Sequence, residues 1–224
     1  MAVNDAAGRR EEVFGAVGYP WESWFELIVA VILGLATLGS AWSAYQSGLW
    51  NGIQIFRLAE SIGAGRRAAE KAVYAQQLRM TDLVLFESYA SALTENNQRF
   101  AEFLFQRFRP EFKVATEAWL ATRPLKNPSA PPSPFVIKEY SLAVEKEMQQ
   151  ARQEKTTKFT QARKANETSD TSLLLTVLFS VALFLGGITA AFKTRRIRGI
   201  VLVLSVMTIT AAAVFMAFLP LAKE

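Results

Sequence analysis

Residues Leu27 to Phe56 read LIVAVILGLATLGSAWSAYQSGLWNGIQIF, a run without Asp, Glu, Lys or Arg. A helix crosses the ~30 Å hydrocarbon core of a bilayer with about 20 consecutive apolar residues, and this run is longer than that. Two further charge-free runs of sufficient length extend from Thr171 to Phe192 and from Gly199 to Ala222. The sequence therefore predicts an integral membrane protein with three transmembrane helices.

The first run is expected to remain in the mature protein. It follows several acidic residues and far exceeds the ~7 to 15 apolar residues of a signal peptide. The whole chain is only moderately hydrophobic, with a mean hydropathy of +0.15, because its 25 basic and 20 acidic residues lie outside the three runs.

The predicted fold class is all-α, with a long antiparallel helical hairpin outside the membrane. Five prolines between residues 122 and 134 end one helix and start a loop. Apolar residues recur at helical steps before this loop, from Leu83 to Leu104, and after it, from Tyr140 to Ala162. The predicted segments are a polar lead (1–20), a first transmembrane helix with a polar extension (21–56), the hairpin (57–170) with its tip at 122–134, a second transmembrane helix (171–192), a basic loop (193–198) and a third transmembrane helix (199–222).

The basic loop sets the predicted orientation. Four cations and no acid lie between the second and third helices: Lys193, Arg195, Arg196 and Arg198. By the positive-inside rule this loop is cytoplasmic, which places the N-terminus inside and residues 57–170 outside. Cations also border residues 57–170, but a loop longer than ~60 residues is translocated largely regardless of its charge.

The polar extension of the first helix carries the candidate functional residues. Small residues recur at steps of four and allow another backbone to approach closely: Ala36, Ser40, Ala44, Gly48 and Gly52. An adjacent face carries hydroxyl and amide groups that need partners in or near lipid: Ser43, Gln46, Ser47, Asn51 and Gln54. These faces indicate helix packing, within one chain or between copies, and the alternative is a polar pore lining.

Composition argues against several function classes. The chain has no Cys and no His, which removes disulfides, thiol nucleophiles, and thiolate or imidazole metal ligands. No nucleophile lies near a base, so no catalytic, cofactor-binding or metal site is predicted. Proton-coupled carriers, pumps and voltage sensors use charged residues inside the membrane, and the three runs have none. The net charge of +5 is not accompanied by a nucleic-acid-binding motif, so we expect no nucleic-acid partner.

Five phenylalanines alternate with basic residues between positions 99 and 113. This pattern is typical either of a surface that contacts a membrane or partner, or of a hairpin core with solvated arginines. Because the phenylalanines fall on more than one helical face, they also indicate burial by more than one neighbouring helix.

The stretch AWSAYQSGLWNG at residues 41–52, the ANETSD lead at 165–170 and the basic loop together resemble small bacterial inner-membrane proteins of a domain-of-unknown-function type. Those proteins have one N-terminal membrane helix, a helical middle and a C-terminal membrane hairpin. The resemblance implies a bacterial inner membrane and carries no activity.

The sequence thus favours a non-enzymatic membrane protein that acts by assembly, as a homo-oligomer or as an accessory subunit of a larger complex. Its expected partners are the lipid bilayer and either further copies or another membrane complex. The alternative is a homo-oligomeric channel lined by the polar face of the first helix.

Overall fold

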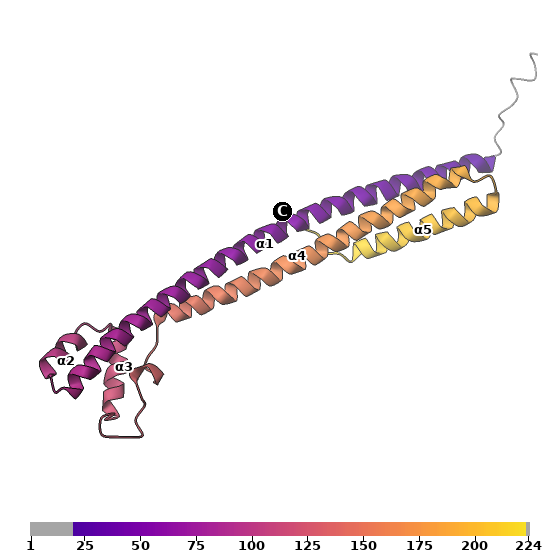
Figure 1. Cartoon of the computed structure of the whole chain (residues 1–224). Helices are drawn as coiled ribbons and strands as arrows, with labels where there is room; N and C mark the ends of the chain where they lie inside the picture. Colours follow the sequence, from indigo (N-terminus) through magenta and orange to yellow (C-terminus); the bar gives the residue numbers. More distant parts are fainter. Residues whose placement is uncertain (1–19, 223–224) are drawn as a thin grey trace, which may run out of the picture. The chain divides into compact units, whose positions relative to one another are not determined.

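The structure is a computed structural model that describes residues 20–222, with side chains described from Trp24 onward. Throughout this range the regular elements are helical, as the all-α prediction requires (Figure 1). The elements in chain order are α1 (Pro20–Thr94), α2 (Gln98–Phe105), α3 (Pro110–Ala121), the 3₁₀ helix η1 (Pro134–Val136), α4 (Ala143–Ile188), the 3₁₀ helix η2 (Thr189–Ala191) and α5 (Arg195–Ala217).

Three helical stretches are long and apolar enough to cross a membrane: Trp24–Thr94, Ala143–Ala191 and Arg195–Ala217. Each includes all or most of one predicted transmembrane run, so the prediction of three membrane-type helices is confirmed at this level. The third helix, α5, ends at Ala217, before the predicted end at Ala222. The chain divides into two compact units. Of the described residues, the membrane unit comprises 20–54 and 163–222, and the middle unit comprises 55–162.

The membrane unit has one apolar core that all three of its helices share. Ala36 of α1, Leu175 and Phe179 of α4, and Ala212 of α5 are buried together. Helices α4 and α5 follow one another as a hairpin and lie side by side (Figure 1). Their contact includes a hydrogen bond that Ser205 Oγ donates to the Ala182 carbonyl oxygen at 2.8 Å, which satisfies a hydroxyl in an apolar setting.

In the middle unit, α1 and α4 run antiparallel. As the residue numbers increase along α1, those of the contacting residues in α4 decrease. Ser61 donates a hydrogen bond to the Lys155 carbonyl at 2.9 Å. The ion pairs further along α1 are Arg67–Glu154, Lys71–Glu147 and Arg79–Glu145. The buried side chains of α1 along this contact are small, namely Ser61, Ala64, Ala68 and Ala75. Alanine and serine allow the two helices to approach closely.

The predicted apolar stripe is buried in part, since its members Leu104, Val144, Ala151 and Ala162 are buried. Leu83, Phe100 and Phe159 were expected to face the partner helix, but their side chains are 46%, 45% and 55% exposed. Between Ser61 and Ala75, α1 instead contacts α4 through serine and alanine side chains. These differ little in hydropathy from an exposed helix face, so a periodicity analysis does not detect them.

The helix predicted to run from residue 83 to 104 is broken at residues 95–97. Asn96 adopts φ 59°, in the left-handed region that Asn tolerates better than most residues. Asn97 then caps α2, because its side-chain oxygen accepts a hydrogen bond from the Phe100 backbone N–H at 3.2 Å. The chain turns here, which allows α2 and α3 to pack beside α1.

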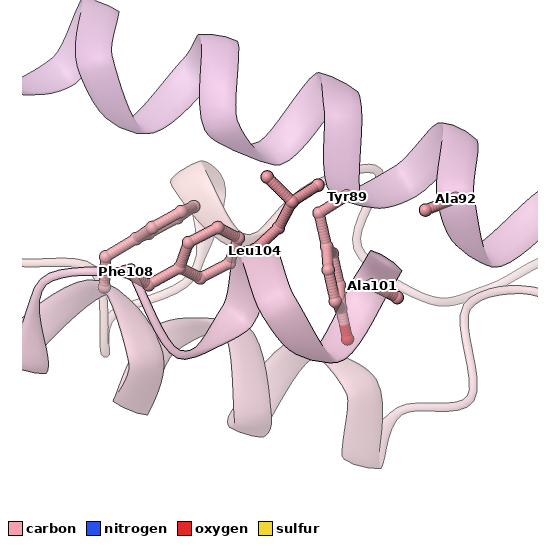
Figure 2. Packing of buried hydrophobic residues seen from close by; sticks show 6 residues of the cluster. Tyr89, Ala92, Ala101, Leu104 and Phe108 are labelled. Carbon is pink, nitrogen blue, oxygen red and sulfur yellow. The ribbon is translucent and has the colours of Figure 1, made fainter. Parts of the chain in front are cut away.

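An aromatic core closes this end of the middle unit. Tyr89 and Ala92 of α1 meet Ala101, Leu104 and Phe108 across the space between the helices (Figure 2). The ring centroids of Phe108 and Phe112 are 4.6 Å apart, and those of Phe86 and Trp119 are 5.2 Å apart. The proline-rich segment is held here too, since Trp119 Nε1 donates to the Pro131 carbonyl at 2.7 Å.

Candidate functional site

Three faces divide the surface of α1 between residues 24 and 54. Residues on an α-helix are separated by about 100° around its axis. The internal face holds buried Ile32, Ala36, Ser43 and Gln46, and the bulky face exposes large apolar side chains, including Leu35 and Leu38. Between them lies a third face, which exposes small residues at alternating steps of four and three: Ala30, Gly34, Thr37, Ala41, Ala44 and Gly48. We call this third face the small-residue seam.

The seam is effectively apolar. Its one hydroxyl, Thr37 Oγ1, donates to the Leu33 carbonyl of the same helix at 2.7 Å. A Cβ built on Gly34 or on Gly48 meets no other atom within 4 Å, so nothing in the described part of the chain covers these positions. The backbone of α1 at Gly34 and Gly48 is therefore accessible to a neighbouring helix or to lipid.

The predicted stripe of small residues is divided between two faces. A step of four residues advances about 40° beyond a full turn, so five positions spaced by four drift by about 160°. Ala36 is accordingly buried, Ser40 is half-buried, and Ala44 and Gly48 are exposed. Gly52 is half-buried, although a Cβ there also meets nothing within 4 Å.

Most of the predicted polar residues lie on the internal face. Ser47 and Ser169 hydroxyl oxygens are 3.2 Å apart, and Ser169 Oγ also donates to the Ser47 carbonyl at 2.9 Å. Ser43 is buried and donates to Met216 Sδ at 3.8 Å. Asn51 is exposed and Gln54 is half-buried. Hydroxyl pairs of this kind join membrane helices because each group needs a partner away from water.

Two side chains of α1 bind the end of the chain after α5. Trp50 Nε1 donates to the Pro220 carbonyl at 3.2 Å. Gln46 Oε1 accepts from the Ala222 backbone N–H at 3.0 Å. The last carbonyls of a helix lack partners within it, and residues just beyond the helix end share that problem. The polar extension of α1 thus satisfies backbone groups where α5 ends.

Two glycines outside the predicted stripe of α1 are the most tightly packed of the described glycines in the membrane unit. A Cβ at Gly39 would lie 2.6 Å from Cε1 of the Phe179 ring, and one at Gly186 would lie 3.0 Å from Leu33 Cδ2. Gly39 does not fall on the spacing of four, so the predicted stripe does not include it. Its position on the internal face, between Ala36 and Ser43, could have identified it as a packing residue.

The four cations of the basic loop have different surroundings. Lys193, Arg195 and Arg196 are exposed, whereas Arg198 is half-buried. The Arg198 guanidinium carbon lies 4.4 Å from the centroid of the Phe25 ring, a cation–π contact. Arg198 therefore holds a defined position between α5 and the start of α1.

The middle unit contains a buried polar cluster that the sequence did not reveal. Asp82 of α1 is fully buried and accepts two bonds from Arg109, Nε to Oδ1 at 3.1 Å and Nη2 to Oδ2 at 2.5 Å. The Tyr140 hydroxyl donates to Oδ2 at 3.0 Å. These residues are 27 and 58 positions from Asp82, so no local motif connects them.

Burial raises the pKa of the Tyr140 hydroxyl, and its hydrogen bond to Asp82 raises it further. The hydrogen bond to Asp82 also raises the pKa of Arg109. At the surface, the pKa of Glu60 is lowered by its hydrogen bonds to Lys158 and Arg57. Each of these groups keeps its ordinary charge state near neutral pH. Among the described residues no three Asp or Glu side chains lie close enough together to hold a metal ion.

Comparison of the chain with protein-family models, with curated proteins and with solved structures found no match. The geometry of the site is therefore the basis for assigning a function.

Proposed function

We propose that this protein is a non-enzymatic integral membrane protein that acts by assembly, as a homo-oligomer or as an accessory subunit of a larger membrane complex. The observation that carries the proposal is the small-residue seam of α1. Its residues are exposed along a transmembrane segment, and a Cβ built on either of its two glycines meets nothing within 4 Å in the described part of the chain.

The physical argument concerns what covers a helix in a bilayer. Lipid tails are as apolar as Leu, so helices associate there through close van der Waals packing, and small residues allow that approach. The bulky face of α1 presents large side chains to lipid, including Leu35 and Leu38, which are 57% and 69% exposed. The seam repeats at alternating steps of three and four, the spacing of a left-handed helix pair. A second helix fits this face better than lipid does.

The proposed setting is the inner membrane of a bacterium, with the basic loop in the cytoplasm. The middle unit is then a periplasmic helical hairpin that carries the aromatic core at its tip. The four cations of residues 193–198 and the resemblance to small bacterial membrane proteins support this placement.

The geometry favours assembly over the channel alternative. A pore lining needs Ser43, Gln46 and Ser47 to face water, but each forms a hydrogen bond within the chain. The seam that remains open for contact is apolar.

The test is the oligomeric state of the full chain in mild detergent, measured by native mass spectrometry. Gly48→Leu combined with Gly52→Leu fills the open positions, and we expect association to weaken by at least about tenfold, since the backbones are forced apart. Gly187→Leu is the matched control, because Gly187 is an exposed membrane glycine of α4 whose Cβ also meets nothing. A wild-type protein that is monomeric and purifies without a partner would refute the proposal, as would an equal effect of the control.

A further inference from the structure

An unusual concentration of positive charge lies where α5 begins. Lys193, Arg195, Arg196 and Arg198 fall within six residues that contain no acid. Within residues 24–222 no carboxylate forms an ion pair with Lys193, Arg196 or Arg198. Like charges at this density repel one another, and an anion between them removes that cost.

The backbone at the same place also favours an anion. Helix α5 has no side-chain hydrogen bond at its N-cap residue, Thr194, and no acidic residue in its first turn. The first N–H groups of a helix have no partner within it and carry a partial positive charge. Arg196 and Arg198 in this first turn are therefore unfavourable unless something negative lies near them.

A separate observation concerns Arg198. Its Nε is buried and has no hydrogen-bond acceptor, and it is the one side-chain nitrogen or oxygen in this condition among the described residues. A buried charged donor without a partner has lost its hydration and gained no hydrogen bond in return, which is unfavourable. The Phe25 ring under the guanidinium holds the side chain in this place. Such an orphaned group is a sign of a missing ion or ligand.

From these observations we infer that the basic loop and Arg198 form a binding site for the headgroup of an anionic phospholipid. A guanidinium edge carries two parallel N–H groups that match two phosphate oxygens. The site borders two transmembrane helices, where a lipid headgroup is the anion at highest local concentration, and basic residues beside a membrane attract anionic lipids. Arg198 makes the specific contact with the phosphate group, and Lys193 and Arg196 contribute positive electrostatic potential around it.

The experiment measures lipid retention by the full chain in mild detergent with native mass spectrometry. Phosphatidylglycerol and phosphatidylcholine with identical acyl chains are added in parallel. We expect one phosphatidylglycerol to be retained about tenfold more tightly than phosphatidylcholine, because only the former has a net negative headgroup. Equal retention of the two lipids would overturn the inference.

Three variants separate a specific site from diffuse charge. Arg198→Ala should lower phosphatidylglycerol affinity about tenfold, and Arg198→Lys about threefold, since lysine keeps the charge but lacks the two-pronged edge. Phe25→Leu should weaken binding without any change of charge. The control is Arg163→Ala, which removes an exposed cation of the membrane unit that is already paired with Glu167 at 3.0 Å. Circular dichroism checks the helix content, and if Arg198→Ala does not fold, the other two variants decide.

Two further experiments identify which anion occupies the site. Inorganic phosphate and glycerol phosphate should fail to displace the lipid, and displacement would indicate a site for soluble anions instead. Replacing Glu11, Glu12 and Glu22 by Gln should leave lipid retention unchanged. A rise in retention would show that the acidic lead of this chain occupies the cations, which would also overturn the inference. The result does not depend on assembly, because a monomer that retains phosphatidylglycerol would support this site while refuting the proposed function.

Discussion

Asp82 shows how much a single residue holds together in the middle unit. Its carboxylate is fully buried, and it joins the start of α3, through Arg109, to the segment before α4, through Tyr140. A buried carboxylate with its charge partner and a hydroxyl donor has its hydrogen-bonding needs met. Removing one member leaves the others without a partner, which costs more than the pair itself contributes.

We expect Asp82→Ala to destabilise the middle unit by roughly 3 kcal/mol, toward the lower end for a broken buried ion pair. The lower end applies because the Arg109 side chain remains 25% exposed and recovers some hydration. The measurement is urea unfolding followed by the fluorescence of Trp119, the single tryptophan of residues 55–162.

Glu111→Ala is the matched control for this prediction. Glu111 binds the same arginine at 3.2 Å, but its side chain is 49% exposed. A solvent-exposed ion pair contributes at most about 1 kcal/mol. If the two variants lost equal stability, burial of Asp82 would not be the reason for its effect.

At the scale of elements, the packing of α1 against α4 in the membrane unit depends on a glycine. Gly39 faces the Phe179 ring so closely that a methyl group would overlap it, since three ring atoms lie 2.6 to 2.9 Å from an ideal Cβ. Phe179 is itself buried in the shared core. The ring therefore has little room to move.

Gly39→Ala is expected to destabilise the membrane unit by about 1–3 kcal/mol, the usual cost of overpacking a core. Gly187→Ala should be neutral or slightly stabilising, because its Cβ meets nothing and Ala favours a helix over Gly by about 1 kcal/mol. Thermal unfolding in detergent compares the two variants. Phe179→Leu should restore part of the loss in the Gly39→Ala background, and failure to do so would place the overlap elsewhere.

The elements also differ in how far the sequence predicts them. Each membrane helix was predictable because a charge-free run of this length in a helical protein is rarely found outside a membrane. On α4, the predicted positions Val144, Ala151 and Ala162 are buried. The α1 side of this contact was not predictable, since it is made by Ser61, Ala64 and Ala68, which barely differ from a solvated helix face in hydropathy. The helix break at Asn96 was not predicted either, because apolar residues continue in helical register on both sides of it.

The same limit applies to the candidate site. The region from Ser43 to Gln54 stands out in the sequence as polar and rich in small residues, because such a composition is unusual beside a membrane run. Its division into faces depends on the exact helical phase, which a spacing of four misjudges by about 40° at each step. The partners of Trp50 and Gln46 lie 170 and 176 residues away, beyond any local pattern.

At the scale of the whole molecule, the property to test is which side of the membrane each segment occupies. The absence of cysteine makes this directly testable, since any introduced cysteine is the only one in the chain. Ser129 lies in the proline-rich segment and Thr194 in the basic loop, and both are exposed. The positive-inside rule predicts opposite sides for these two positions.

We expect an impermeant maleimide to label Ser129→Cys in cells whose outer membrane has been permeabilised and whose inner membrane is intact. Thr194→Cys should be labelled only after the inner membrane is opened, because four cations oppose the transfer of its loop. Opening the inner membrane is also the control that shows both cysteines to be reactive. The reverse labelling pattern would place the middle unit in the cytoplasm, and the cations of residues 57–170, instead of those of the loop, would then have decided the orientation.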